Sequence, residues 1–128
     1  MTKREHAQTL RDDAAMHYNC CQAVLIPFAA ECGLTEEQAA RLGSHFGGGM
    51  RYGSTCGALT GALMVLGLMG KDDVDTAKAA LNRFREANGA LDCATLLKDR
   101  AERGIPRKEG CDGMVAQGVA IVEELRGE

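Results

Sequence analysis

The stretch GGGMRYGSTCGALTGALMVLG, residues 47 to 67, places seven glycines around a single cysteine, Cys56. Glycine destabilises the interior of a helix, but it is useful where backbone must bend tightly or approach another group closely. Residues 47 to 53 therefore predict a tight loop. The run from Cys56 to about Met69 predicts a helix that is apolar nearly all round. Such a helix belongs at the centre of a fold, where Gly57 and Gly61 would let a second backbone come close.

The segments on both sides of this stretch also have helical patterns. Asn19 with Gln22, and Thr35 with Gln38, have the spacing of capping boxes at helix starts. Expected helices cover residues 3 to 17, 20 to 32 with a kink at Pro27, 36 to 46, 73 or 75 to 88, 93 to 104, and 112 onward. No segment has a strong strand pattern. The sequence therefore predicts an all-α fold: a compact single-domain bundle of about six to seven helices, spanning residues 1 to 128, around a central Gly/Ala-rich apolar helix.

Composition and charge narrow the function. The net charge of −3 gives no basic face for nucleic acid. The polar N-terminus lacks the apolar region of a signal peptide. The longest apolar run, residues 57 to 70, is shorter than the roughly 20 residues that span a bilayer. We therefore expect a cytoplasmic protein that does not insert into membranes.

The six cysteines are notable for such a protein, because structural disulfides are uncommon in a reducing compartment. Four of them fall at expected helix starts. Cys20 follows the cap Asn19, Cys56 follows Thr55, Cys93 follows Asp92, and Cys111 precedes Asp112. The alternative is that these are scattered core residues, since cysteine often acts as a small buried hydrophobe. Cys32 ends a helix and is expected to pack, and packing is also favoured for Cys21.

A helix N-terminus favours thiolate over thiol, because its free N–H groups carry partial positive charge. Thiolate is both the nucleophile of disulfide exchange and the ligand of zinc or iron. If the four starts converge, the glycine loop could donate further N–H groups to sulfur. The chain has no C-x-x-C pair, so the zinc-ribbon and ferredoxin patterns are missing, and it has no C-x-x-C-H haem attachment motif. We therefore expect no haem.

The residues NCCQAV (19 to 24) and FGGGMRYGSTCGALTGALMVLG (46 to 67), followed by a lone Cys93 and a lone Cys111, resemble the C-GCAxxG-C-C family of redox-active proteins. The resemblance extends from about residue 14 to 125. It implies that Cys20, Cys56, Cys93 and Cys111 are the four family cysteines, while Cys21 stands where relatives often carry alanine. The family is also similar to the non-haem part of split-Soret cytochromes, which are dimers with a proposed iron–sulfur centre.

Three hypotheses follow for these four cysteines. They bind one iron–sulfur cluster for electron transfer or redox sensing, they form disulfides without metal, or they hold a structural zinc ion in a non-enzymatic module. An electron-transfer or thiol partner protein is implied by the first two, and a homodimer stays open. His17 and His45 are weaker ligand candidates. The residues expected to surround the site are Cys21, Gly48, Gly49, Arg51, Thr55 and Gly57.

Overall fold

The computed structural model describes residues 1–127 and confirms the all-α prediction, with no strand among those residues. The α-helices are α1 (Lys3–Arg11), α2 (Cys20–Leu25), α3 (Glu36–Gly43), α4 (Gly57–Leu68), α5 (Val74–Asn88), α6 (Cys93–Glu102) and α7 (Arg107–Leu125). Short 3-10 turns follow α2 at Ile26–Phe28 and Ala30–Cys32, and a wider turn at Gly49–Gly53 precedes α4.

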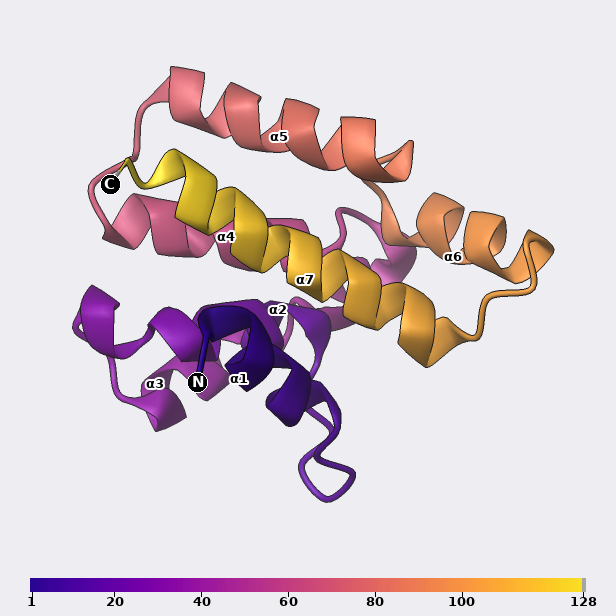
Figure 1. Cartoon of the computed structure of the whole chain (residues 1–128), viewed down its shortest axis with the longest axis horizontal. Coiled ribbons are helices and arrows are strands. Elements are labelled where there is room, and N and C mark those ends of the chain that lie inside the picture. Colours follow the sequence, from indigo (N-terminus) through magenta and orange to yellow (C-terminus); the bar gives the residue numbers. More distant parts are fainter. Residues whose placement is uncertain (128) are drawn as a thin grey trace.

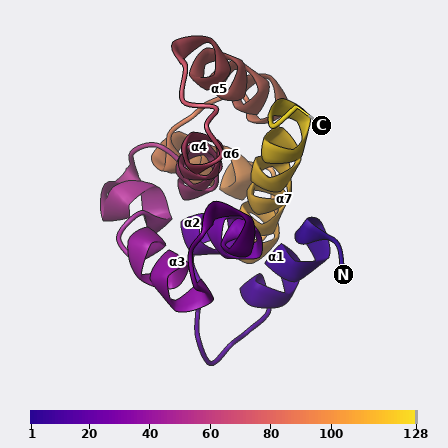
Figure 2. The same cartoon turned by 90° about the vertical axis from the view of Figure 1, so that its left-hand side faces the viewer.

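Helix α4 lies at the centre of the fold, as its apolar sequence predicts. It packs against α2 on one side and against α7 and α5 on the other, so that α1, α2 and α3 form the lower part of the molecule in Figure 1. The view in Figure 2 shows α4 enclosed between α2, α5 and α7. Side chains such as Leu59, Ala62 and Val65 are fully buried in this position.

Glycines set the spacing between the three inner helices. A Cβ atom at Gly61 of α4 would lie 2.9 Å from the carbonyl oxygen of Cys21 in α2. A Cβ atom at Gly118 of α7 would lie 2.8 Å from the carbonyl oxygen of Ala58 in α4. Because no real Cβ fits at these distances, α2 and α7 approach α4 more closely than any larger residue would permit.

The predicted helix starts at Asn19, Thr35, Asp73 and Asp92 are confirmed, since each of these side chains accepts a hydrogen bond from the first turn of its helix. The predicted ends are less accurate. The first helix ends at Arg11 instead of residue 17, and α3 ends at Gly43 instead of residue 46. The second helix gives way to 3-10 turns around Pro27, because proline has no N–H to continue an α-helix.

Two predicted starts near the cysteines are wrong. Thr55 does not cap α4, because it forms an isolated antiparallel bridge with Asp92, and Cys56 takes the capping position itself. The last helix begins at Arg107 rather than near Asp112, because Pro106 occupies the capping position, where its fixed φ is tolerated. Cys111 therefore lies one turn inside α7.

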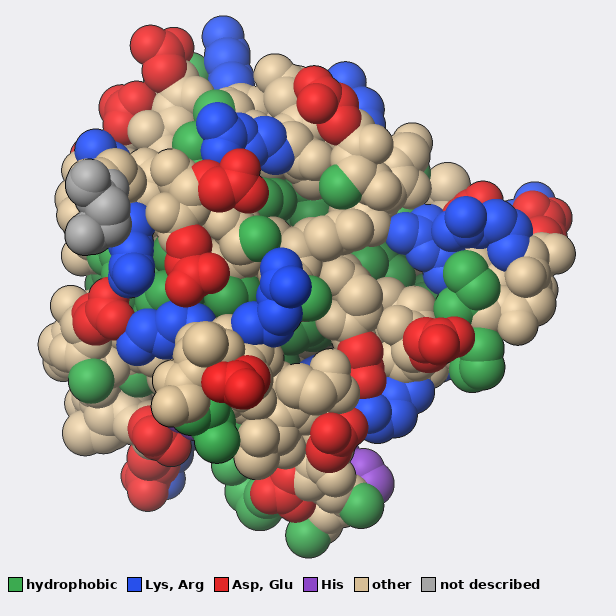
Figure 3. All heavy atoms as spheres, in the orientation of Figure 1, with side chains coloured by type: hydrophobic (Ala, Val, Ile, Leu, Met, Phe, Trp, Pro, Cys, Tyr) green, Lys and Arg blue, Asp and Glu red, His purple; other side chains and the backbone are tan. Residues whose placement is uncertain are grey.

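In the described part of the chain, no helix combines the length and the apolar character needed to cross a membrane. On the face shown in Figure 3, lysine and arginine side chains alternate with aspartate and glutamate side chains, and hydrophobic side chains show only in small patches between them. The sequence carries 15 lysine and arginine residues and 18 aspartate and glutamate residues, and on this face the two kinds are interspersed.

Candidate four-cysteine site

The four cysteines selected by their sequence positions lie around one cavity. Cys20, Cys56, Cys93 and Cys111 all line a cavity of about 410 Å³ at the junction of α2, α4, α6 and α7. Cys20, Cys56 and Cys93 are buried, and Cys111 is partly exposed. Six other residues complete the wall: Arg11, Asn19, Gly48, Arg107, Lys108 and Met114.

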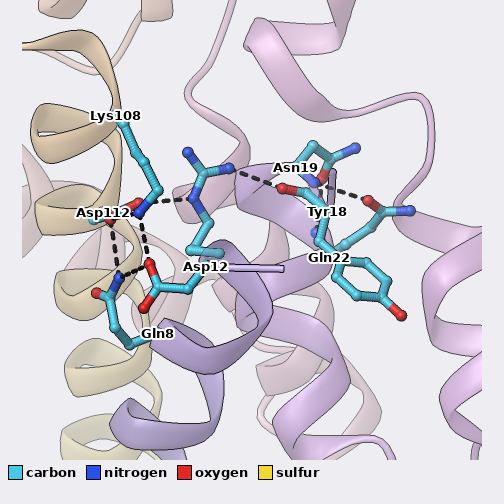
Figure 4. A network of polar contacts seen from close by, with 8 residues as sticks. Gln8, Asp12, Tyr18, Asn19, Gln22, Lys108 and Asp112 are labelled. Atoms are coloured by element: carbon cyan, nitrogen blue, oxygen red, sulfur yellow. Dashed lines mark hydrogen bonds and ion pairs between the residues drawn. The ribbon is translucent and has the colours of Figure 1, made fainter. Parts of the chain in front are cut away.

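Local hydrogen bonds place Cys20 at the start of α2. The Asn19 side chain accepts a hydrogen bond from the N–H of Gln22, and the Gln22 side chain accepts one from the N–H of Asn19 (Figure 4). Asn19 also donates to the carbonyl oxygens of Gly43 and Ser44. This one residue therefore caps α2 and ties the site to the segment that follows α3.

A backbone clamp places Cys56 and Cys93 side by side. The N–H of Cys56 donates to the carbonyl oxygen of Leu91 at 2.8 Å, and the N–H of Cys93 donates to the carbonyl oxygen of Ser54 at 2.6 Å. These two bonds flank the bridge between Thr55 and Asp92. The relative position of the two cysteines is therefore fixed by main-chain atoms on both sides.

The glycine loop folds over the site in an unusual backbone conformation. Gly48, Gly49, Met50 and Arg51 follow one another with φ between 59° and 65°, in the left-handed region. A non-glycine residue there is strained, and strain of this kind collects at functional sites. The N–H groups of Gly48 in this turn and of Gly57 at the start of α4 both lower the pKa of Cys20.

Cys20 is the sulfur best prepared to carry negative charge. A hydrogen bond from Cys56, hydrogen bonds from the N–H groups of Gly48 and Gly57, and the charge of Arg11 lower its pKa to about 6, against the opposing effect of burial. The Cys56 thiol also lies 3.8 Å from the sulfur of Met114, but the Cys20 thiolate is the stronger acceptor. The pKa of Cys56 is raised, first by its bond to Cys20 and then by burial.

The other two site cysteines have raised pKa values. Burial, followed by the negative charge of Cys20, raises the pKa of both Cys93 and Cys111. The charges of Arg11 and Arg107 oppose this effect at Cys111. The pKa is therefore lowered at Cys20 and raised at the other three cysteines, and three cationic side chains from α1 and α7 line the same cavity.

Among the residues that the sequence placed around the site, Gly48 lines the cavity and Gly57 contacts Cys20. Gly49 follows Gly48 in the left-handed turn, and Thr55 forms the clamp with Asp92. Cys21 and Arg51 do not line the cavity. Cys21 is fully buried next to Met64, where burial raises its pKa to about 12, and Arg51 is exposed and donates to the carbonyl oxygen of Ser44.

Cys32, His17 and His45 also lie away from the cavity wall. Sequence reasoning missed Arg11, Arg107, Lys108 and Met114, which do line it. The pair Arg107-Lys108 could have been found by placing the start of the last helix at Pro106. Arg11 reaches the site only through tertiary packing, and no local signal marks it.

The cysteines surround a space and do not meet at one point. Within residues 1–127, no three His, Cys, Asp or Glu side chains form a group that could hold a metal ion. The cavity between the cysteines has many times the roughly 30 Å³ that one water molecule occupies in the liquid.

Comparison with known proteins gives one match. The family model described as "Putative redox-active protein (C_GCAxxG_C_C)" matches residues 18–125, which include all six cysteines and leave α1 outside. None of the curated proteins and none of the solved structures matches the chain.

Proposed function

The chain belongs to the C_GCAxxG_C_C family, and we propose that Cys20, Cys56, Cys93 and Cys111 together bind one iron–sulfur cluster, which makes the protein an electron carrier or a redox sensor. The observation that carries this proposal is the shared cavity: four cysteines from four different helices line it. Four thiolates are the usual ligand set of a [2Fe–2S] or [4Fe–4S] cluster.

The surroundings of the cavity suit a negatively charged group. A cluster held by four thiolates is anionic, and buried negative charge is costly unless it is compensated. Here the N–H groups of Gly48 and Gly57 lower the pKa of Cys20 and so favour its negative charge, and successive backbone N–H groups in turns can form anion-binding concavities. The side chains of Arg11, Arg107 and Lys108 add positive charge along the wall.

The cluster and the protein would contribute different parts of the function. The bound cluster would supply one-electron transfer. The protein would hold the four thiolates in place through the Asn19 cap and the backbone clamp, limit solvent access by burying three of them, and offset their charge. Hydrogen bonds to the sulfurs and the degree of exposure are the factors by which a protein tunes such a centre.

The test is purification without oxygen, followed by measurement of iron, acid-labile sulfide and visible absorbance. We expect iron and sulfide in similar amounts and a brown colour that bleaches on reduction. Replacing any one of the four cysteines by serine should remove most of the iron. Cys32→Ser and Cys21→Ala are the matched controls, because these cysteines lie outside the cavity. Both variants should keep their iron. Protein without iron and sulfide would overturn the proposal.

A second candidate function rests on the contact between Cys20 and Cys56. Here the Cys20 thiolate attacks a disulfide of a partner protein and releases one partner thiolate. Cys56 then gives its proton to the partner thiolate released in the first step and attacks the Cys20 sulfur of the mixed disulfide, which releases the second partner thiolate. The partner is reduced by two electrons, and a Cys20–Cys56 disulfide forms.

One variant separates the two functions. Cys93→Ser should abolish cluster binding, but it should leave the Cys20–Cys56 exchange intact. Thiol counting after treatment with oxidised glutathione measures the second activity. Loss of two thiols in both wild type and Cys93→Ser, with no iron in either, would favour disulfide exchange over the cluster. A single zinc ion per chain, lost on chelation together with stability, would favour the structural zinc site.

A further inference from the structure

Helix α1 brings one charged residue to the cysteine cavity from outside the family match. The match begins at residue 18, whereas Arg11 is the last residue of α1 and lines the cavity with the four cysteines. The helix packs along α7, which carries Cys111. Helix α1 therefore forms part of the cavity wall, although it lies outside the family match.

Two hydrogen bonds fix the Arg11 guanidinium. Its Nε donates to Oδ1 of Asp112 at 2.9 Å, and its Nη1 donates to the carbonyl oxygen of Tyr18 at 2.9 Å. Only 15% of the side chain is exposed. An arginine held by two bonds at its planar head has one orientation, and it stays charged at every relevant pH.

Asp112, the partner of Arg11, is itself held in place. Gln8 and Lys108 both donate to Asp112, and Figure 4 shows that the same two side chains also donate to a second carboxylate, that of Asp12. Because Asp112 follows Cys111 in the chain, its carboxylate would repel a thiolate there if it stood alone. Arg11, Gln8 and Lys108 thus all donate to the Asp112 carboxylate, and two of these donors are shared with Asp12.

Arg11 lines the same cavity as the four cysteines, and its ion-pair partner Asp112 follows Cys111 in the chain. The other two cations of the wall, Arg107 and Lys108, are exposed residues, so water and salt weaken their effect. Arg11 is thus the cation of this wall that solvent screens least.

Building on the cluster proposed above, we propose that Arg11 is a positioning residue that stabilises negative charge at the four-cysteine site. Reduction adds one electron, supplied by a donor such as dithionite, to the site without breaking a bond or moving a proton. A fixed positive charge beside the site stabilises the reduced form more than the oxidised form. Arg11 therefore raises the reduction potential.

The experiment compares the midpoint potentials of wild type, Arg11→Gln and Arg11→Lys, titrated with dithionite without oxygen. Arg83→Gln is the matched control, because Arg83 also makes one ion pair, with Glu124, but faces a different part of the surface. We expect Arg11→Gln to shift the equilibrium between the reduced and oxidised forms about tenfold toward the oxidised form. For a one-electron step this lowers the midpoint potential by about 59 mV. Arg11→Lys should recover most of this shift, and Arg83→Gln should show none. Because Arg11 is largely buried, the shift should persist at about 0.5 M salt.

Each outcome decides the question. Equal potentials in wild type and Arg11→Gln would overturn the role of Arg11, as would an equal loss in Arg11→Lys, since the lysine keeps the charge. Melting temperatures of the same variants show whether a shift comes from a disturbed fold. If the wild type holds no iron, the cluster proposal fails. In that case the role of Arg11, which rests on the cluster, is overturned with it, whereas iron in the wild type together with unchanged potentials overturns the role of Arg11 alone.

Discussion

Replacing Gly57 by alanine should disrupt the contact between α4 and α2 at the cysteine site. A Cβ atom at this position would lie 2.5 Å from the sulfur of Cys20 and 2.5 Å from the carbonyl oxygen of Phe46. Both atoms would have to retreat by about 0.9 Å to reach ordinary contact, in an interior packed as densely as an organic crystal. Overpacking of this kind costs about 1–3 kcal/mol. The better helix propensity of alanine returns at most about 1 kcal/mol.

The same helix provides the control. Gly67 is exposed, and a Cβ atom there would meet nothing within 4 Å. Gly67→Ala should therefore leave stability unchanged or raise it by up to about 1 kcal/mol. Thermal denaturation of the metal-free proteins measures the difference, at about 4 °C for each kcal/mol in a domain of this size. Because the sulfur of Cys20 is displaced, Gly57→Ala should also bind less iron than Gly67→Ala. Equal melting temperatures for the two variants would refute the claim that α2 and α4 need a glycine at their contact.

Other changes probe the loop, the cap and the thiolate. Gly49→Ala should destabilise the protein more than Gly48→Ala, since both have positive φ but only a Cβ at Gly49 collides with backbone, and chemical denaturation that ranks them equally would contradict this. Asn19→Ala should lower the free energy of unfolding by about 1 kcal/mol or more, because it removes a helix cap, and an unchanged denaturation midpoint would count against that role. Alkylation of Cys20 by iodoacetamide in the metal-free protein should fall to half its maximal rate near pH 6 and slow further as the pH drops, because the thiolate is the reactive form. Peptide mapping should find Cys21 unmodified over the same range, and a midpoint near 9 for Cys20 would show that its neighbours do not lower its pKa.

Local chemistry accounts for what the sequence predicts well. Asn19 and Asp92 mark helix starts because a side chain bonds to a backbone N–H only a few residues away. The central position of α4 follows from its apolar residues, and the close approach of α2 follows from Gly61. Helix starts therefore identify Cys20, Cys56 and Cys93 as cysteines near helix N-termini, but they do not predict that these N-termini meet at one junction.

Tertiary contacts account for what the sequence predicts poorly. Thr55 has the side chain of a helix cap, but its bridge with Asp92 shifts that position to Cys56. The start at Arg107 has no capping side chain to reveal it, because Pro106 has none to offer. Arg11 binds Asp112 across 101 positions of the chain, and no pattern within α1 indicates which partner it meets.

The backbone clamp at Cys56 and Cys93 also makes the site observable without any cofactor. Helices α4 and α5 form an excursion of the chain that leaves and returns at this clamp, and its two ends are joined through the amide protons of the two cysteines. Those protons can exchange with deuterium only when the base of the excursion opens. Their exchange rates therefore report how often the cysteine junction comes apart in the intact protein, even before iron or sulfide is added.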